Sequence, residues 1–244
     1  MEQPPVQPGA EPMSVAGSDT GVLVVHGFTG SPQSMRPIAR ACADAGYSVE
    51  MPRLPGHGTT VADMHTTSWA DWSAHVEATY LDLAARASTV FVVGLSMGGA
   101  LSLWLAARHP EVAGIVLINS AGQPSPEMAA GIDDMLGQGL TEMDAVGNDI
   151  AKADVVELAY DTTPLAPLKS LLDAVDAFDL STVTCRALIL VSEQDHVVPP
   201  ETAEYIAANL GSEARVVPLT RSYHVATLDH DADLIIDETL AFIG

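Results

Sequence analysis

The stretch from Thr89 to Ala100 constrains the fold of this chain more than any other. Four consecutive β-branched or aromatic residues, Val90 to Val93, predict a strand that is buried on both faces. The turn Gly94-Leu95-Ser96-Met97-Gly98 follows, and an alanine- and leucine-rich run then predicts a helix that ends at His109-Pro110. A buried strand, a sharp turn and a helix in this order indicate an α/β fold.

The Gly-x-Ser-x-Gly pattern of this turn has a physical reason. A serine between such a strand and helix adopts a strained backbone, and side chains two residues before or after it would collide with their neighbours. The turn lifts the Ser96 hydroxyl above the sheet and directs the Met97 N–H at whatever that hydroxyl attacks. A small-residue turn of a nucleotide-binding fold has a similar pattern, so the motif alone leaves both interpretations open.

Composition and charge narrow the function classes. The 244 residues suffice for one large α/β domain, and 48% hydrophobic residues allow a sizeable core. A formal net charge of −22 argues against nucleic acid as a partner. No apolar run reaches the length of a membrane span, and the first twenty residues lack the features of a secretory signal, so we expect a cytoplasmic protein. Cys42 and Cys185 are expected to be free thiols, and no ligand spacing predicts a metal site.

The chain divides into four parts. Residues 1–20 are rich in proline and predict a loose lead-in, with an edge strand near Met13–Ala16. Residues 21–119 and 181–244 alternate strand and helix patterns and predict a mostly parallel sheet with helices on both faces. Residues 120–180 lack a strand pattern and predict a small helical lid. Its expected helices are Met128–Leu136, Leu140–Ala145, Asp154–Tyr160 and Pro167–Ala177.

Three polar residues follow predicted strands directly: Ser96, Asp195 and His224. The carboxyl ends of parallel strands share one edge of an open sheet, and ligands bind there. In this chain order the three residues fit a nucleophile, an orienting acid and a general base. Glu193 is an alternative acid, but the turn that begins at Asp195 suits the position after the strand better.

A second loop suits the stabilisation of negative charge. His26-Gly27-Phe28 follows the strand Val22–Val25 directly, where the backbone can face a ligand. The Phe28 N–H is therefore expected to join the Met97 N–H as a second donor to an oxyanion. His57 lies between two glycines, and we expect its ring to hydrogen-bond loop backbone and not to take part in catalysis.

Together, these segments resemble the bacterial monoacylglycerol lipases and related carboxylesterases of the α/β-hydrolase superfamily. The resemblance rests on Gly21–Gly30, Met51–Thr59, Gly94–Gly99, Asp195–Pro200 and Ser222–Asp229. It implies an α/β-hydrolase fold and cofactor-free hydrolysis of monoacylglycerols, and of other short or medium acyl esters, to fatty acid and alcohol. The reaction would pass through an acyl-enzyme on Ser96.

The resemblance also implies substrate contacts. On the glycerol side it points to Glu157 in the lid and, through water, to Asn119. A carboxylate suits glycerol because a monoacylglycerol offers two hydroxyl donors; otherwise Glu157 is one more exposed acid on the lid. Val146 corresponds to an apolar lid contact at which isoleucine is usual in the family, which leaves the preferred chain length open.

Other functions stay open at this point. The chain could be a general carboxylesterase or thioesterase without glycerol selectivity, a perhydrolase, or a binding protein on a hydrolase scaffold. The complete set of catalytic residue types argues against the binding protein. The expected partner is a small amphiphilic lipid ester, met either in dispersed form or through transient contact with a membrane surface. The sequence does not fix the oligomeric state.

Overall fold

The main sheet of the protein has seven strands in the order β1-β3-β2-β4-β5-β8-β9. The structure is a computed structural model, and it describes residues 4–123, 125–145 and 148–244. Only the β1–β3 pair is antiparallel within the described part of this sheet, so the mostly parallel sheet expected from the sequence is confirmed. The strands are β1 (Met13–Val15), β2 (Thr20–Val25), β3 (Ser48–Met51), β4 (Thr89–Leu95), β5 (Gly114–Ile118), β8 (Arg186–Ser192) and β9 (Ala214–Leu219).

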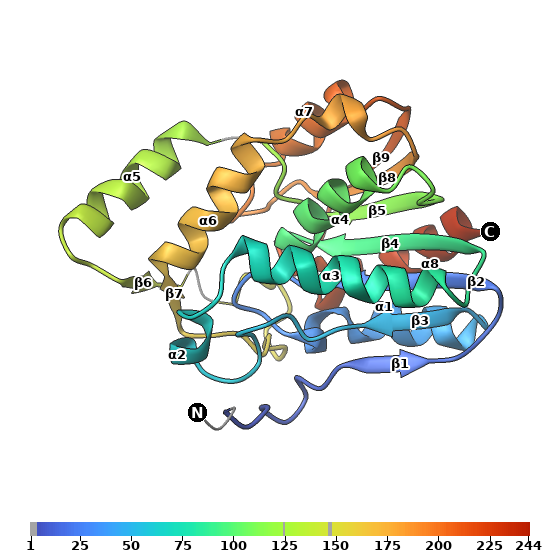
Figure 1. Ribbon diagram of the computed structural model, residues 1–244, viewed down its shortest axis with the longest axis horizontal. Coiled ribbons are helices and arrows are strands. Elements are labelled where there is room, and N and C mark those ends of the chain that lie inside the picture. The colour runs from blue at the N-terminus through green and yellow to red at the C-terminus, as the bar shows by residue number, and fades with distance from the viewer. Residues whose placement is uncertain (1–3, 124, 146–147) are drawn as a thin grey trace.

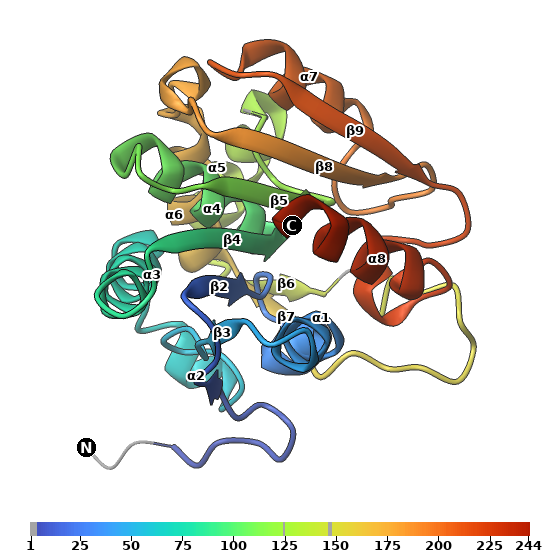
Figure 2. The same cartoon turned by 90° about the vertical axis from the view of Figure 1, so that its right-hand side faces the viewer.

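Helices cover both faces of the sheet, as Figure 2 shows. Side chains alternate along each strand, so Leu23 and Val25 of β2 join one buried apolar cluster and Val22 and Val24 join the other. Helices that pack on the first cluster include α3 (Trp69–Ala84), α4 (Met97–Arg108), α6 (Leu165–Asp176) and α7 (Glu201–Asn209). The second cluster packs against α1 (Pro32–Asp44) and α8 (Ala232–Ile243).

Strand β4 lies in the middle of the sheet, with three strands on either side. It pairs with β2 from Thr20↔Thr89 to Val25↔Gly94, and with β5 from Phe91↔Gly114 onward. The carboxyl ends of β2, β4, β5 and β8 therefore meet at one edge of the sheet. This edge is where the sequence places the candidate site residues.

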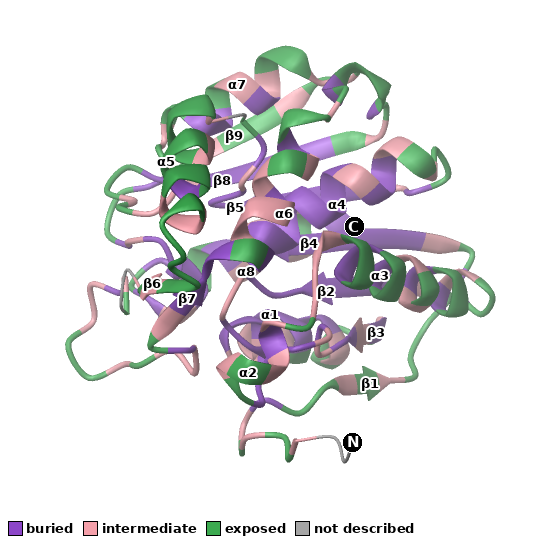
Figure 3. Ribbon diagram, turned by 60° about the vertical axis from the view of Figure 1, so that its left-hand side comes forward, coloured by how far each residue is buried: buried purple, intermediate pink, exposed green. Residues whose placement is uncertain are grey.

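An insertion between β5 and β8 lies beyond that edge (Figure 1). Its helix α5 is mostly exposed, whereas strands β5 and β8 of the sheet are mostly buried (Figure 3). In α5 only Ile132 is buried. A short helix between β3 and α3, α2 (Val61–Met64), contacts the insertion at β7. The insertion contains α5 (Pro126–Gly137), β6 (Glu142–Asp144), β7 (Thr162–Pro164) and α6 (Leu165–Asp176).

Two of the four helices expected in the insertion are wrong. The stretch Leu140–Ala145 contains strand β6, which pairs with β7 in an antiparallel ladder. The stretch Asp154–Tyr160 contains no helix. Most of its backbone hydrogen bonds go to the side chains of Gln33 and Asn148 and to the Thr29 carbonyl, which are partners that local periodicity cannot reveal. The helices expected near Met128–Leu136 and Pro167–Ala177 are confirmed as α5 and α6.

The N-terminal lead-in also makes more contacts with the rest of the protein than the sequence suggests. Ala10 is fully buried, although residues 1–20 were expected to be loose. The Gln7 side chain donates to the Thr59 carbonyl at 2.7 Å, and Arg36 donates to the carbonyls of Gly9 and Glu11 at 3.1 and 2.7 Å. The edge strand is present as β1. Within the described residues, no helix is long and apolar enough to cross a membrane.

Candidate active site

Ser96 lies at the strained turn between β4 and α4. Its backbone has φ 55° and ψ −116°, a conformation that a residue with a side chain seldom adopts. A Cβ atom added at Gly94 would lie 2.1 Å from the Gly98 carbonyl oxygen, and one at Gly98 would lie 2.2 Å from that of Val25. Both glycines of the motif are therefore required by close backbone packing, as the sequence predicts.

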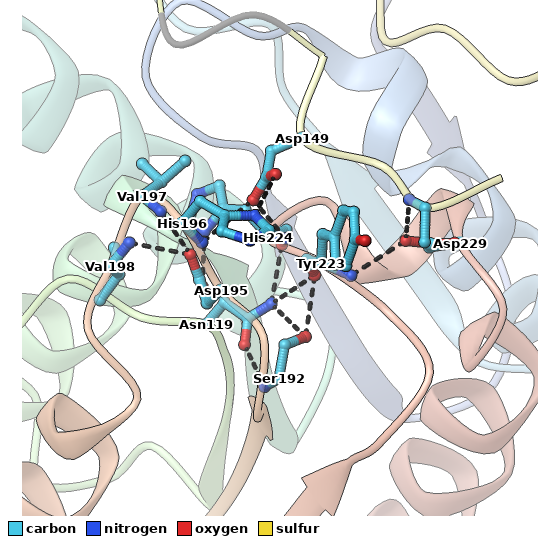
Figure 4. A network of polar contacts seen from close by, with 11 residues as sticks. Asn119, Asp149, Ser192, Asp195, His196, Val197, Val198, Tyr223, His224 and Asp229 are labelled. Carbon is cyan, nitrogen blue, oxygen red and sulfur yellow. Dashed lines mark hydrogen bonds and ion pairs between the residues drawn. The ribbon is translucent and has the colours of Figure 1, made fainter. Parts of the chain in front are cut away.

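Asp195 and His224 come together at the same edge of the sheet, as Figure 4 shows. Asp195 Oδ2 lies 2.8 Å from His224 Nδ1, and the two side chains are only 1% and 9% exposed. The other carboxylate oxygen, Oδ1, accepts the N–H groups of Val197 and Val198 at 2.8 and 2.9 Å. The carboxylate is thus held on both oxygens, which fixes the proton of His224 on Nδ1 and leaves Nε2 free. Glu193, the alternative acid, is exposed.

Ser96 is half-buried at this edge. Among the contacts of the described residues there is no hydrogen bond between Ser96 Oγ and the His224 ring. In hydrolases without substrate such bonds are often long, and they tighten when substrate binds.

The loop after β2 lies directly against Ser96. A Cβ atom added at Gly27 would lie 3.4 Å from Ser96 Cβ and 3.9 Å from its hydroxyl oxygen. Within the described part of the chain, neither the Phe28 N–H nor the Met97 N–H has a hydrogen-bond acceptor. Two backbone donors beside Ser96 are therefore available to a ligand.

Two buried histidines support this loop. His26 Nδ1 donates to the Gly27 carbonyl at 2.9 Å, and its Nε2 accepts the Leu54 N–H at 3.2 Å. Burial and the neighbouring His57 hold the pKa of His26 well below its usual value. His57 donates from Nδ1 to the Pro55 carbonyl at 2.9 Å, and burial lowers its pKa to about 4. His57 therefore hydrogen-bonds loop backbone, as the sequence analysis expected.

Asn119 has φ 43° and lies at the end of β5. Its amide nitrogen donates to the His224 carbonyl at 2.7 Å, the Tyr223 carbonyl at 3.2 Å and the Ser192 hydroxyl at 2.9 Å. Its amide oxygen accepts the Ser192 N–H at 2.7 Å. These contacts tie the His224 loop to the sheet edge (Figure 4), while the expected water-mediated glycerol contact of Asn119 stays a prediction.

The Glu157 carboxylate lies against the loop after β2 although Glu157 belongs to the insertion. A Cβ atom added at Gly30 would lie 2.7 Å from Glu157 Oε1, which places the carboxylate against the loop that carries Phe28. Burial raises the pKa of Glu157, and the charge of His224 and the Ser34 hydroxyl oppose this shift. Glu157 is therefore not an ordinary surface acid. Val146, the other lid residue expected to contact substrate, lies outside the described residues.

Three polar residues near the site were not expected from the sequence. Gln33 donates to the Val156 carbonyl at 3.1 Å and accepts the Leu158 N–H at 2.9 Å. Asn148 accepts the Glu157 N–H at 2.7 Å, so the two amides together hold the backbone around Glu157. The third is Asp149, which contacts the loops of His224 and Asp195. For Asn148 and Asp149 the only signal in the sequence is that Asn and Asp often bond to backbone in polar stretches, and this signal does not identify the partner. Gln33 has no such signal.

The site has no cluster of metal ligands: within the ranges that the structure describes, no group of three or more His, Cys, Asp or Glu side chains could hold a metal ion.

Comparison with known proteins places the chain in a family. The chain is 50% identical to a thermostable monoacylglycerol lipase of Bacillus sp. (strain H-257), over 100% of this chain and 98% of that protein. It is 26% identical to a carboxylesterase of Bacillus subtilis (strain 168), over 96% of each chain.

Solved structures agree with these relatives. A structure from a study of two metagenome-derived lipolytic enzymes, LipS and LipT, matches with a TM-score of 0.93 and 46% identity, over 98% of this chain and 99% of that chain. The fold is also that of a monoacylglycerol lipase of Paleococcus ferrophilus, with a TM-score of 0.79 at 18% identity, over 96% of this chain and 98% of that one. Residues 22–238 match the model of the alpha/beta hydrolase family, and the chain therefore belongs to this family.

Proposed function

We propose that this protein is a serine hydrolase that cleaves monoacylglycerols, and other short or medium acyl esters, to fatty acid and alcohol. The observation that carries the proposal is the buried Asp195–His224 pair at the sheet edge that also bears Ser96 on its strained turn. The identity of 50% to a monoacylglycerol lipase over the whole chain supports the substrate class.

In this proposal, Ser96 is the nucleophile and His224 the general base. His224 Nε2 takes the Ser96 proton as the hydroxyl oxygen attacks the ester carbonyl, and it then gives the proton to the leaving alcohol. Asp195 holds the tautomer and stabilises the imidazolium. The Phe28 and Met97 N–H groups bind the oxyanion, an effect worth about 3–4 kcal/mol per donor in comparable sites. Water then releases the acid from the acyl-enzyme by the same steps.

Glu157 is proposed to recognise the glycerol part of the substrate. A carboxylate that is partly removed from water gains from strong donors, and the free hydroxyls of a monoacylglycerol supply them. Asn119, through water, and Val146 are proposed as further contacts with the substrate. The position of Glu157 against Gly30 and the shift in its pKa support this assignment.

A general carboxylesterase without glycerol selectivity is the second candidate, since the chain is also similar to a carboxylesterase along its length. Under either function the substrate is a small amphiphilic ester. The insertion exposes Met128, Leu140 and Val156, which supports transient contact with a lipid surface.

The first part of the experiment tests the nucleophile. Wild type and Ser96→Ala are treated with a fluorophosphonate probe, and hydrolysis of a medium-chain monoacylglycerol is measured in parallel. We expect Ser96→Ala to lose labelling and about 10⁴-fold or more of kcat, with an unchanged circular dichroism spectrum. Labelling at another residue, or retained turnover in the folded variant, would contradict the proposal.

The second part compares a monoacylglycerol with the methyl ester of the same acid, in wild type, Glu157→Gln and Glu127→Gln. Glu127 is an exposed acid of α5 and serves as the matched control. Loss of hydrogen bonds to a charged group should lower kcat/KM for the monoacylglycerol about 10- to 100-fold in Glu157→Gln and leave the methyl ester nearly unchanged. Equal cleavage of both esters by wild type would favour the general carboxylesterase.

A further inference from the structure

Asp149 belongs to the insertion, yet its carboxylate bonds to both loops that carry the proposed acid and base. Oδ2 accepts the backbone N–H of His224 at 3.0 Å and that of His196 at 3.2 Å, and Oδ1 lies 2.7 Å from His196 Nδ1. The side chain of Asp149 is 11% exposed. The Asp149 carboxylate therefore joins His196, the residue after Asp195, to the backbone of His224 (Figure 4).

A second set of contacts fixes the backbone on which Asp149 stands. The Asp149 carbonyl accepts the Val225 N–H at 3.1 Å. Asp229, which is fully buried, accepts the N–H groups of Ala151 at 2.6 Å and Lys152 at 3.1 Å, and also that of Tyr223 at 3.0 Å. The insertion around Asp149 is thus hydrogen-bonded to the loop that carries His224 by its backbone as well as by the Asp149 side chain.

The pairing of His224 with Asp195 depends on the relative position of these two loops. Asn119 holds the His224 carbonyl from the sheet side, and Asp149 holds the His224 N–H from the insertion side. Misplacement of a catalytic group by about 1 Å can cost about 100-fold in rate. A bond that sets the two loops against each other is therefore a determinant of the rate and not only of stability.

We propose that Asp149 is a positioning residue for hydrolysis: it holds the His224 and His196 backbones together and so aligns His224 with Asp195 and Ser96. This inference rests on the proposed function, since it assumes that His224 is the general base. It also gives the insertion a part in catalysis itself, beyond binding of the substrate.

The test uses Asp149→Asn, which keeps the shape of the side chain but removes the negative charge, so that its single oxygen accepts the His224 and His196 N–H groups more weakly than the carboxylate does. Asp154→Asn, an exposed acid in the same insertion, is the matched control. Labelling with the fluorophosphonate to completion counts the competent sites in each sample. We expect kcat per labelled site to fall about 10- to 100-fold in Asp149→Asn, with KM for a short methyl ester changed less than about threefold, and no change in the control.

A purely structural role gives a different result. It would lower the thermal midpoint or the fraction of labelled protein, and kcat per labelled site would stay at the wild-type value, which would overturn the inference. A second readout is the low-field proton resonance of the His224 Nδ1–H, which should broaden or shift in Asp149→Asn and stay sharp in Asp154→Asn. If Asp149→Asn does not fold, Asp149→Ser is measured in the same way, because its hydroxyl retains one acceptor.

The proposed function and this inference can fail separately. If the probe does not label Ser96 in wild type, the proposed function fails. If Ser96 is labelled and Asp149→Asn keeps its kcat per site, only the positioning role fails. His196→Ala, which removes the ring contact and keeps the backbone contacts, should cost less than about threefold in kcat, since the inference assigns alignment to the backbone N–H groups. An equal loss in His196→Ala and Asp149→Asn would overturn that assignment.

Discussion

The sheet and the insertion hold the site by different kinds of interaction. Beneath Ser96, the strands present apolar side chains that are almost fully buried, such as Val93, Leu95 and Leu117. The part of the insertion nearest the site is held instead by side chains that bond to backbone, mainly those of Gln33, Asn148, Asp149 and Asp229. Changes in the sheet should therefore act on stability, and changes in the insertion on rate and selectivity.

The largest expected effect is at Gly98→Ala, in the first turn of α4, which packs against the end of β2. The new methyl group would lie 2.2 Å from the Val25 carbonyl oxygen and 2.8 Å from that of His26, and backbone of a central strand cannot move away. We expect a loss of about 4 kcal/mol or more in the free energy of unfolding, measured by urea denaturation.

Gly131→Ala in α5 is the matched control in the insertion. Outside the backbone of its own helix, no described atom lies within 4 Å of the position that its Cβ would take, and the residue is exposed. This variant should gain about 0.5–1 kcal/mol of stability, because alanine has fewer unfolded conformations than glycine. A similar loss in both variants would contradict the contrast between the two regions.

The next effect is a dependence of stability on pH that originates in the loops at the sheet edge. The folded pKa of His57 is about 4, below the usual value of 6.5, so the unfolded chain binds more protons between these pH values. The contribution of His57 to the free energy of unfolding is therefore fully present above about pH 6.5. About 3 kcal/mol of it is lost as the pH is lowered towards 4. His26 acts in the same direction.

Urea denaturation at several pH values between 4 and 8 measures this dependence. His57→Asn keeps a donor for the Pro55 carbonyl and removes the titrating ring. The difference in stability between the ends of the pH range should be smaller in this variant than in wild type. An identical pH dependence in the two proteins would show that His57 does not contribute.

The smallest of these effects should be at Gln33→Leu, in α1, whose side chain holds the insertion from the core. The variant loses both hydrogen bonds to the backbone on either side of Glu157. We expect the preference for monoacylglycerol over methyl ester to fall about threefold to tenfold, with a loss of stability below about 1 kcal/mol. The control is Gln138→Leu, which changes an exposed glutamine at the C-terminal end of α5. This variant should leave the preference unchanged. If the preference stays at the wild-type value, Gln33 does not hold Glu157 for binding.

The same contrast explains what could be predicted from the sequence. The strands and the turn at Ser96 are visible because a run such as Val90–Val93 and the Gly-x-Ser-x-Gly spacing are patterns within a few residues, even though the contact that requires Gly98 is with the distant Val25. The insertion segment Asp154–Tyr160 is not, because its backbone partners include Gln33, more than a hundred residues away. Asp149 was missed for the same reason: nothing near it in the sequence indicates His224 as its partner.

Three residues with side chains have positive φ in the described part of the chain, and each follows one of three neighbouring strands. They are Thr29 after β2, Ser96 after β4 and Asn119 after β5, with φ of 59°, 55° and 43°. Such conformations cost about 1–3 kcal/mol each. Glycine would relieve this strain, but at Asn119 it would also remove the four hydrogen bonds that tie the His224 loop to the sheet edge. Protein engineers who seek thermostability would therefore find more room at exposed positions of the insertion, such as Gly131, than at this edge.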